Sequence, residues 1–121
     1  MKDLYKYGLD EAEPGLAELE PDFPNIRRDF EQLLTLLESK PFSLGERIDP
    51  SDRVLEHVSW TPIHHTGRGS VGRSAGILIY QVWRDENAYH IQLLAVLRGS
   101  AWKALTAAEM KTEVRKLVSP P

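Results

Sequence analysis

The sequence predicts an α+β domain: a small antiparallel sheet with helices packed on one face. Three observations lead to this prediction. An amphipathic helix is expected at residues 23–39, two β-rich apolar runs joined by a polar turn predict a hairpin over 77–98, and a capped helix begins near Thr106. Strands joined by a short turn are typical of antiparallel pairing, and the apolar stripes of the helices need a sheet face to cover.

The composition is that of an ordinary globular protein. The chain has 121 residues, of which 41% are hydrophobic and 27% are charged, and it contains no cysteine. One domain is therefore expected, and disulfides and thiolate metal sites are excluded. No apolar run approaches the roughly 18 residues of a membrane span, and residues 1–5 lack the apolar core of a secretory leader. We therefore expect a cytoplasmic protein with no membrane partner.

Charge is distributed unevenly along the chain. The net charge of −3 combines −6 over residues 1–50 (12 acids, 6 bases) with +3 over residues 51–121 (6 acids, 9 bases). Residues 1–22 hold seven acids and a proline–glycine pair at Pro14, so we expect an acidic segment of low order there, followed by a single domain over 23–121. A local basic surface in the second half is compatible with the acidic total, because contacts to phosphate depend on placement.

The first predicted helix follows from the period of its apolar residues. These residues form one stripe at helical spacing: Ile26, Phe30, Leu33, Leu34 and Leu37. Asp22 is expected to cap this helix and Pro24 to lie in its first turn. Pro41 is expected to end it.

Three strands are predicted after this helix. Residues 54–60 form the first, and a basic, glycine-rich loop at 61–75 leads into a hairpin of strands 77–83 and 88–98. One face of the last strand is expected to be the core floor under both long helices: Tyr89, Ile91, Leu93, Ala95 and Leu97. The other face is expected to be partly wet: His90, Gln92, Leu94, Val96 and Arg98.

The C-terminal helix has a clear start signal. Thr106 and Glu109 have the spacing of a capping box, and Leu105 with Met110 fits the hydrophobic staple that accompanies it. The buried stripe of this helix is expected to be Ala107, Met110, Val114, Leu117 and Val118.

Neither a cofactor nor a metal is expected. Gly67, Gly69 and Gly72 have the spacing of a dinucleotide fingerprint, but that motif opens a helix and this one opens a strand. His64 and His65 are adjacent, so their side chains point apart in an extended loop, and no carboxylate has convincing ligand spacing.

The arginines and histidines of the second half indicate a different chemistry. If Arg98 shares the wet face with His57 and His90, the sheet presents a base, an acid and a guanidinium together. Metal-free RNA cleavage needs this set: one group takes the 2′-OH proton, another protonates the leaving oxygen, and guanidiniums stabilise the charged phosphorane. Solvated arginines at the strand edge are the alternative.

These arguments give two sets of candidates. The catalytic candidates are Arg73, Arg98, His90 and His57. The RNA-binding candidates are Arg68, Arg73, Arg98 and Lys103.

The order of elements, with the segment Gly72-Arg73-Ser74-Ala75-Gly76-Ile77-Leu78-Ile79-Tyr80-Gln81-Val82 in its middle, resembles the RelE/ParE toxin superfamily. Members commonly show a basic residue, small residues with glycine and a hydrophobic strand with tyrosine, then a strand with a basic end and a C-terminal helix. The resemblance covers roughly residues 22–118 and carries over to Arg73 and Arg98, whereas His57 and His90 come from the face argument alone.

The resemblance implies a toxin of a type II toxin–antitoxin system. A RelE-like member is a metal-independent endoribonuclease that cuts mRNA at the ribosome and is neutralised by a cognate antitoxin protein. A ParE-like member shares the fold but inhibits DNA gyrase without cutting RNA. A catalytically inactive interaction module of the same fold is a third reading. The sequence therefore leaves open whether this protein is an enzyme.

Overall fold

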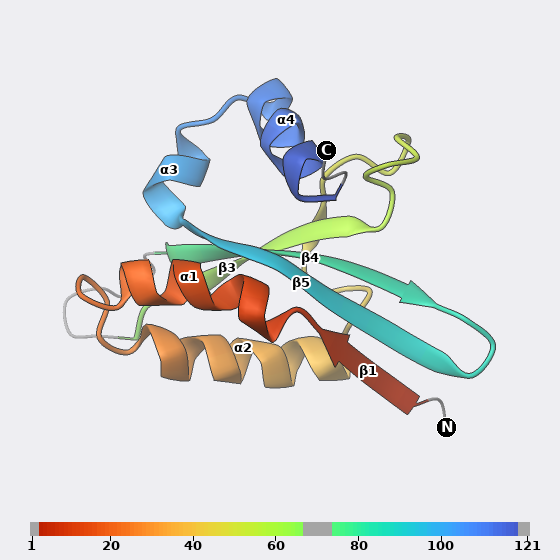
Figure 1. The fold of residues 1–121 in the computed structure, drawn as a ribbon, viewed down its shortest axis with the longest axis horizontal. Coiled ribbons are helices and arrows are strands. Elements are labelled where there is room, and N and C mark those ends of the chain that lie inside the picture. The colour runs from red at the N-terminus through yellow and green to blue at the C-terminus, as the bar shows by residue number, and fades with distance from the viewer. Residues whose placement is uncertain (1–2, 67–73, 119–121) are drawn as a thin grey trace.

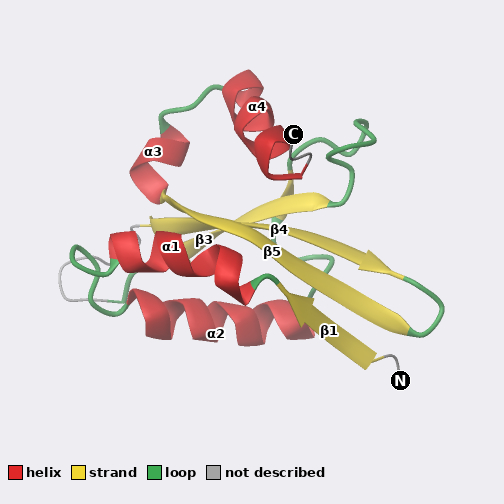
Figure 2. Cartoon of the chain, in the orientation of Figure 1, coloured by secondary structure: helices red, strands yellow, loops and turns green. Residues whose placement is uncertain are grey.

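The computed structural model describes residues 3–66 and 74–118, which form one sheet and four helices (Figures 1 and 2). The strands are β1 (Asp3–Tyr7), β2 (Glu46–Arg47), β3 (Val58–His64), β4 (Ser74–Arg84) and β5 (Ala88–Arg98). The helices are α1 (Leu9–Leu19), α2 (Ile26–Ser39), α3 (Gly99–Lys103) and α4 (Ala107–Val118). None of these helices is long and apolar enough to cross a membrane.

The sheet is mixed, with the strand order β1-β5-β4-β3-β2. β2, β3, β4 and β5 pair in antiparallel fashion, whereas β1 runs parallel to β5. The predicted α+β class and the hairpin of β4 and β5 are confirmed. The expectation of a purely antiparallel sheet is wrong, because β1 lies beside β5 and runs in the same direction. α1 continues in the direction of β1, and α2 runs back along it (Figure 1).

Helices cover both faces of the sheet, which corrects the expectation of helices on one face (Figure 1). One apolar cluster joins the sheet to α1 and α2, and its buried members include Leu16, Phe30, Leu34, Leu78 and Leu93. The second cluster joins the sheet to α3 and α4, and its buried members are Leu55, Val58, Ile77, Ile79, Trp102 and Val114. The domain therefore has three layers around a central hairpin.

A β-bulge explains why the single apolar face predicted for β5 does not exist. Ile79 pairs with Ala95 but Tyr80 pairs with Leu93, so Leu94 is an extra residue in the ladder. A bulge of one residue inverts the alternation of faces beyond it. Accordingly Leu93 packs toward α1 and α2, whereas Leu97 packs with the α3 and α4 cluster.

The N-terminal residues differ from the acidic segment of low order that composition suggested. They form β1 and α1, and the helix buries Ala12, Leu16 and Leu19 at helical spacing. Pro14 lies inside α1, and Gly15 lets the helix approach β5 closely, because a Cβ at this position would clash with the Val96 carbonyl oxygen. The proline–glycine pair thus marks a close contact between helix and strand, not an end of order.

Two boundaries also differ from prediction. α2 begins at Ile26, with Asn25 at its N-cap and no side-chain cap bond, so Asp22 lies three residues before the cap position. Asp22 forms an ion pair with Arg98. β3 begins at Val58 and continues through Pro62. Proline is tolerated there because β2 pairs only with Ser59 and Trp60, so Pro62 lies beside an open edge.

The start of α4 is as predicted. The Thr106 backbone N–H donates to Glu109 Oε1 at 2.9 Å, and the Glu109 N–H donates to Thr106 Oγ1 at 3.1 Å, so the capping box is confirmed. Val114 is buried and Met110 packs beside it in the second cluster, whereas Ala107 is exposed.

Candidate functional site

The predicted site residues do not come together in one place. Arg68 and Arg73 lie outside the described residues. Lys103 is exposed at the end of α3. Arg98, at the end of β5, pairs with Asp22 at 3.0 Å between guanidinium Nη2 and carboxylate Oδ2.

Arg98 is remote from the two histidines with which it was grouped. It lies eight positions beyond His90 in β5, which is about 26 Å along a strand at about 3.3 Å per residue. The bulge at Leu94 also turns Arg98 to the α1 and α2 side, where Asp22 lies, and leaves His90 on the other face. The expected shared face would require unbroken alternation along β5, which the bulge interrupts.

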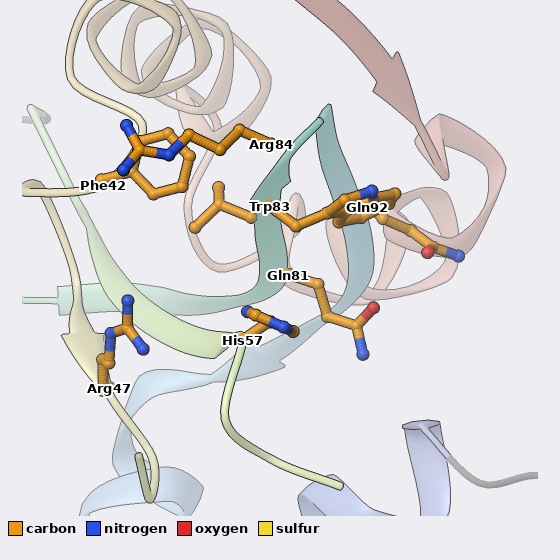
Figure 3. Close-up of a pocket in the computed structure, with 8 residues that line it drawn as sticks. Phe42, Arg47, His57, Gln81, Trp83, Arg84 and Gln92 are labelled. Carbon is orange, nitrogen blue, oxygen red and sulfur yellow. The ribbon is translucent and has the colours of Figure 1, made fainter. Parts of the chain in front are cut away.

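An open hollow lies at the other end of the hairpin, near His57. β3 begins at Val58, which pairs with Gln81, so Trp83 and Arg84 of β4 extend past the start of β3. The hollow formed there has a volume of about 800 Å³. Its lining residues are Phe42, Arg47, His57, Gln81, Val82, Trp83, Arg84 and Gln92 (Figure 3).

The hollow is electropositive. Its lining includes Arg47, Arg84 and His57 and, among the described residues, no acidic side chain. Arg47 reaches it from β2, where Nη1 donates to the Glu56 carbonyl oxygen at 2.7 Å. The Arg84 guanidinium lies over the Phe42 ring (Figure 3), and 5.8 Å separates its central carbon from the ring centre. Guanidiniums bind phosphate through forked hydrogen bonds, so an anionic ligand suits this hollow.

His57 is the accessible histidine of the hollow. It precedes β3, and 54% of its side chain is exposed. Its Nε2 lies 3.5 Å from Glu56 Oε1, and its carbonyl oxygen accepts a hydrogen bond from the Val82 N–H at 3.0 Å. The backbone is therefore fixed beside β4, while the imidazole can meet a ligand.

His90 lies in a stack of aromatic rings next to the hollow. Trp83 and His90 are register partners, and their rings are nearly parallel with centres 5.0 Å apart. Tyr5, the partner of His90 on β1, stacks on it at 5.6 Å. Tyr7 is nearly parallel to both rings, 5.9 Å from His90 and 6.3 Å from Trp83. The stack thus joins β1, β5 and β4 across the exposed sheet.

Both nitrogens of His90 have polar partners. Nε2 lies 2.8 Å from Asp85 Oδ2, and Nδ1 lies 3.1 Å from the Tyr7 hydroxyl. The hydrogen bond from His90, together with the N–H groups of Asn87 and Ala88, lowers the pKa of Asp85. An ionised carboxylate accepts hydrogen bonds only, so Asp85 fixes the orientation of the imidazole.

Sequence reasoning missed the other functional side chains of this region, which include Tyr7, Arg47, Trp83, Arg84 and Asp85. The run from 61 to 84 contains no acid, and that signal could have found Trp83 and Arg84. No local signal places Tyr7 or Arg47, because their positions depend on the parallel pairing of β1 and on the β2–β3 contact.

No group of three histidine, aspartate or glutamate side chains within 3–66 and 74–118 is placed to hold a metal ion. Comparison of the chain with protein-family models, curated proteins and solved structures finds no significant match.

Proposed function

We propose that this protein is a toxin of a type II toxin–antitoxin system, a RelE-like metal-independent endoribonuclease that cuts mRNA at the ribosome, and that RNA binds in the hollow. One observation carries the proposal. Arg47, Arg84 and His57 surround a hollow of about 800 Å³ whose lining, over the part of the chain that the structure describes, contains no acid. A polyanion is the ligand that such a lining favours.

Single-stranded RNA fits the remaining lining better than other anions do. Trp83 supplies an aromatic ring on which an unpaired base can stack. Gln81 and Gln92 are register partners on adjacent strands, so their carboxamides, each with a donor and an acceptor, lie side by side on the sheet. Stacking and hydrogen bonding to base edges are the means by which proteins recognise unpaired RNA bases.

The same groups can support cleavage. The 2′-oxygen attacks the adjacent phosphorus, and Arg47 and Arg84 stabilise the charge that builds on the phosphorane oxygens. The exposed His57, when protonated, gives its proton to the leaving 5′-oxygen. His90 belongs to the system that removes the 2′-OH proton, because it is held against Trp83 at the rim of the hollow.

The test replaces each of the two arginines of the hollow in turn and compares the effects with the replacement of an arginine elsewhere. Arg47→Gln and Arg84→Gln should each weaken binding of a single-stranded RNA by about tenfold, measured by fluorescence anisotropy at low salt, and should lower the salt slope by about 0.7 for each phosphate that is no longer neutralised. Cleavage of mRNA on programmed ribosomes should fall about 10²-fold for each. Arg53→Gln is the control, because it makes the same charge change at an exposed arginine outside the hollow.

The remoteness of Arg98 favours a second candidate, a ParE-like inhibitor of DNA gyrase that does not cut RNA. Induced expression in bacteria, with growth and mRNA integrity followed together, separates the readings. Growth arrest with cut mRNA supports the nuclease and arrest with intact mRNA supports the inhibitor. If every host that lacks a cognate antitoxin grows normally, both toxin readings fail and the protein is an inactive interaction module. If Arg47→Gln and Arg84→Gln bind and cleave RNA as well as wild type does, the hollow is not the RNA-binding site.

A further inference from the structure

His90 is poorly placed to touch RNA itself. Only 13% of its side chain is exposed, and both ring nitrogens already have partners in Asp85 and Tyr7. Tyr7 is 43% exposed. Tyr7 is therefore more accessible than His90 to a substrate on this face.

We propose that Tyr7 is a catalytic residue, the group that accepts the 2′-OH proton of the RNA while it passes its own proton to His90. The inference rests on the proposed function, because it assigns the base of that reaction. Tyr7 borders the hollow through two neighbours: it is the register partner of Gln92, and its ring lies 6.3 Å from that of Trp83.

The hydrogen-bond directions along this chain of groups are determined by Asp85. Its carboxylate also accepts the N–H groups of Asn87 and Ala88, at 2.9 and 2.8 Å, and it is ionised at neutral pH. His90 Nε2 therefore carries a hydrogen and donates it to Asp85, which leaves the lone pair of a neutral ring on Nδ1. The Tyr7 hydroxyl must then donate to Nδ1. Carboxylate, imidazole and hydroxyl are arranged as in an acid–histidine–nucleophile triad.

The proton transfers balance. The phenolic proton of Tyr7 moves to His90 Nδ1 as the RNA 2′-OH proton moves to the Tyr7 oxygen, so Tyr7 ends the step neutral and His90 becomes an imidazolium beside the Asp85 carboxylate. The 2′-oxygen forms a bond to phosphorus and the bond from phosphorus to the 5′-oxygen breaks. That oxygen takes a proton from His57, and the products are a 2′,3′-cyclic phosphate and a 5′-hydroxyl. No oxidant, reductant or co-reactant is required.

Tyr5 offers a matched comparison within the same strand. Tyr5 and Tyr7 lie on one face of β1, both stack on His90, and they are similarly exposed, at 47% and 43%. The contact of Tyr5 with His90 is through the ring, whereas Tyr7 adds the hydroxyl bond to Nδ1. Phenylalanine keeps either ring and removes only the hydroxyl.

The experiment measures single-turnover cleavage and RNA affinity for wild type, Tyr7→Phe and Tyr5→Phe. We expect Tyr7→Phe to cleave at least about 100-fold more slowly, the scale of losing one general base, with RNA affinity unchanged within about twofold. Tyr5→Phe should cleave at the wild-type rate. In ¹⁵N spectra of the histidine rings, wild-type His90 should carry its hydrogen on Nε2, and the Nδ1 resonance should move in Tyr7→Phe and stay in place in Tyr5→Phe.

The outcomes separate this inference from the function on which it rests. If wild type cleaves no RNA, the proposed function fails and the role of Tyr7 fails with it. If wild type and Tyr7→Phe cleave alike, the ribonuclease stands and Tyr7 is not its base. Equal losses in Tyr7→Phe and Tyr5→Phe would show that the Tyr7 hydroxyl has no role beyond that of the Tyr5 hydroxyl, and would overturn the assignment of Tyr7 as the base. A hydrogen on Nδ1 of wild-type His90 would also overturn the assignment.

Discussion

The two ends of the β4–β5 hairpin lie in opposite environments. At the end that contains Ile77 and Leu97, α1 and α2 cover one face and α3 and α4 cover the other (Figure 1). At the end that contains Trp83 and His90, the hairpin extends with β1 beyond the helices (Figure 2). β-rich residues fill both ends, so the cover supplied by other elements, and not the strand pattern, decides which end is core.

Charge is also handled differently at the two ends. Arg98 at the packed end is paired with Asp22. Arg84 at the open end lies over the Phe42 ring and takes part in no ion pair within the part of the chain that the structure describes. A guanidinium already neutralised by an acid is a weaker phosphate ligand, so the open end is the better candidate for binding.

Deletion of residues 1–22 should have the largest effect, because it removes cover from both ends at once. It takes α1 with its buried Leu16 and Leu19 from the packed end, and β1 from the open end. We expect loss of the cooperative thermal transition in circular dichroism. Glu11→Gln, which removes an exposed acid of α1, is the control and should melt like wild type. A truncated protein with a wild-type transition would restore the interpretation of this segment as an acidic lead-in.

Leu93→Ala is the next largest expected effect and tests how deeply the two faces of β5 are covered. Leu93 is fully buried under α1 and α2, so its truncation should cost about 2–5 kcal/mol through a cavity. Leu94 is half-buried on the other side, and Leu94→Ala should cost less than about 1.5 kcal/mol. Chemical denaturation measures both. Equal losses would mean that the two residues are not divided between a deep and a shallow environment.

Local sequence signals predicted the local parts of the fold. The hairpin, the stripe of α2 and the Thr106–Glu109 capping box are each encoded within about 25 residues, and each is present. The bulge at Leu94 could not be predicted from the sequence, because a strict alternation of faces along β5 does not allow for an extra residue. The spacing of Ala12, Leu16 and Leu19 does indicate the buried face of α1. The many acids around these residues instead favoured a segment of low order.

The candidate site was less predictable than the fold because its residues meet through tertiary pairing. His57 and His90 were named as candidates, but their neighbours were not. Tyr7 meets His90 across 83 positions, and only the parallel β1–β5 pairing brings them together. Arg98 was expected on the same face of β5 as His90, but the bulge at Leu94 places the two residues on opposite faces.

Arg98→Ala has the smallest expected effect on stability. It also tests which end of the β4–β5 hairpin is the place of the proposed cleavage. Its ion pair with Asp22 is partly exposed, at 32% for the arginine side chain, so a double-mutant cycle with Asp22→Ala should give a coupling of at most about 1 kcal/mol. Because Arg98 lies about 26 Å along β5 from His90, we expect RNA affinity and cleavage to change by no more than a few-fold, against about 10²-fold for Arg84→Gln. If Arg98→Ala abolishes cleavage while Arg84→Gln does not, the scissile phosphate lies at the packed end, as the resemblance to RelE/ParE toxins implies, and the hollow is not the active site.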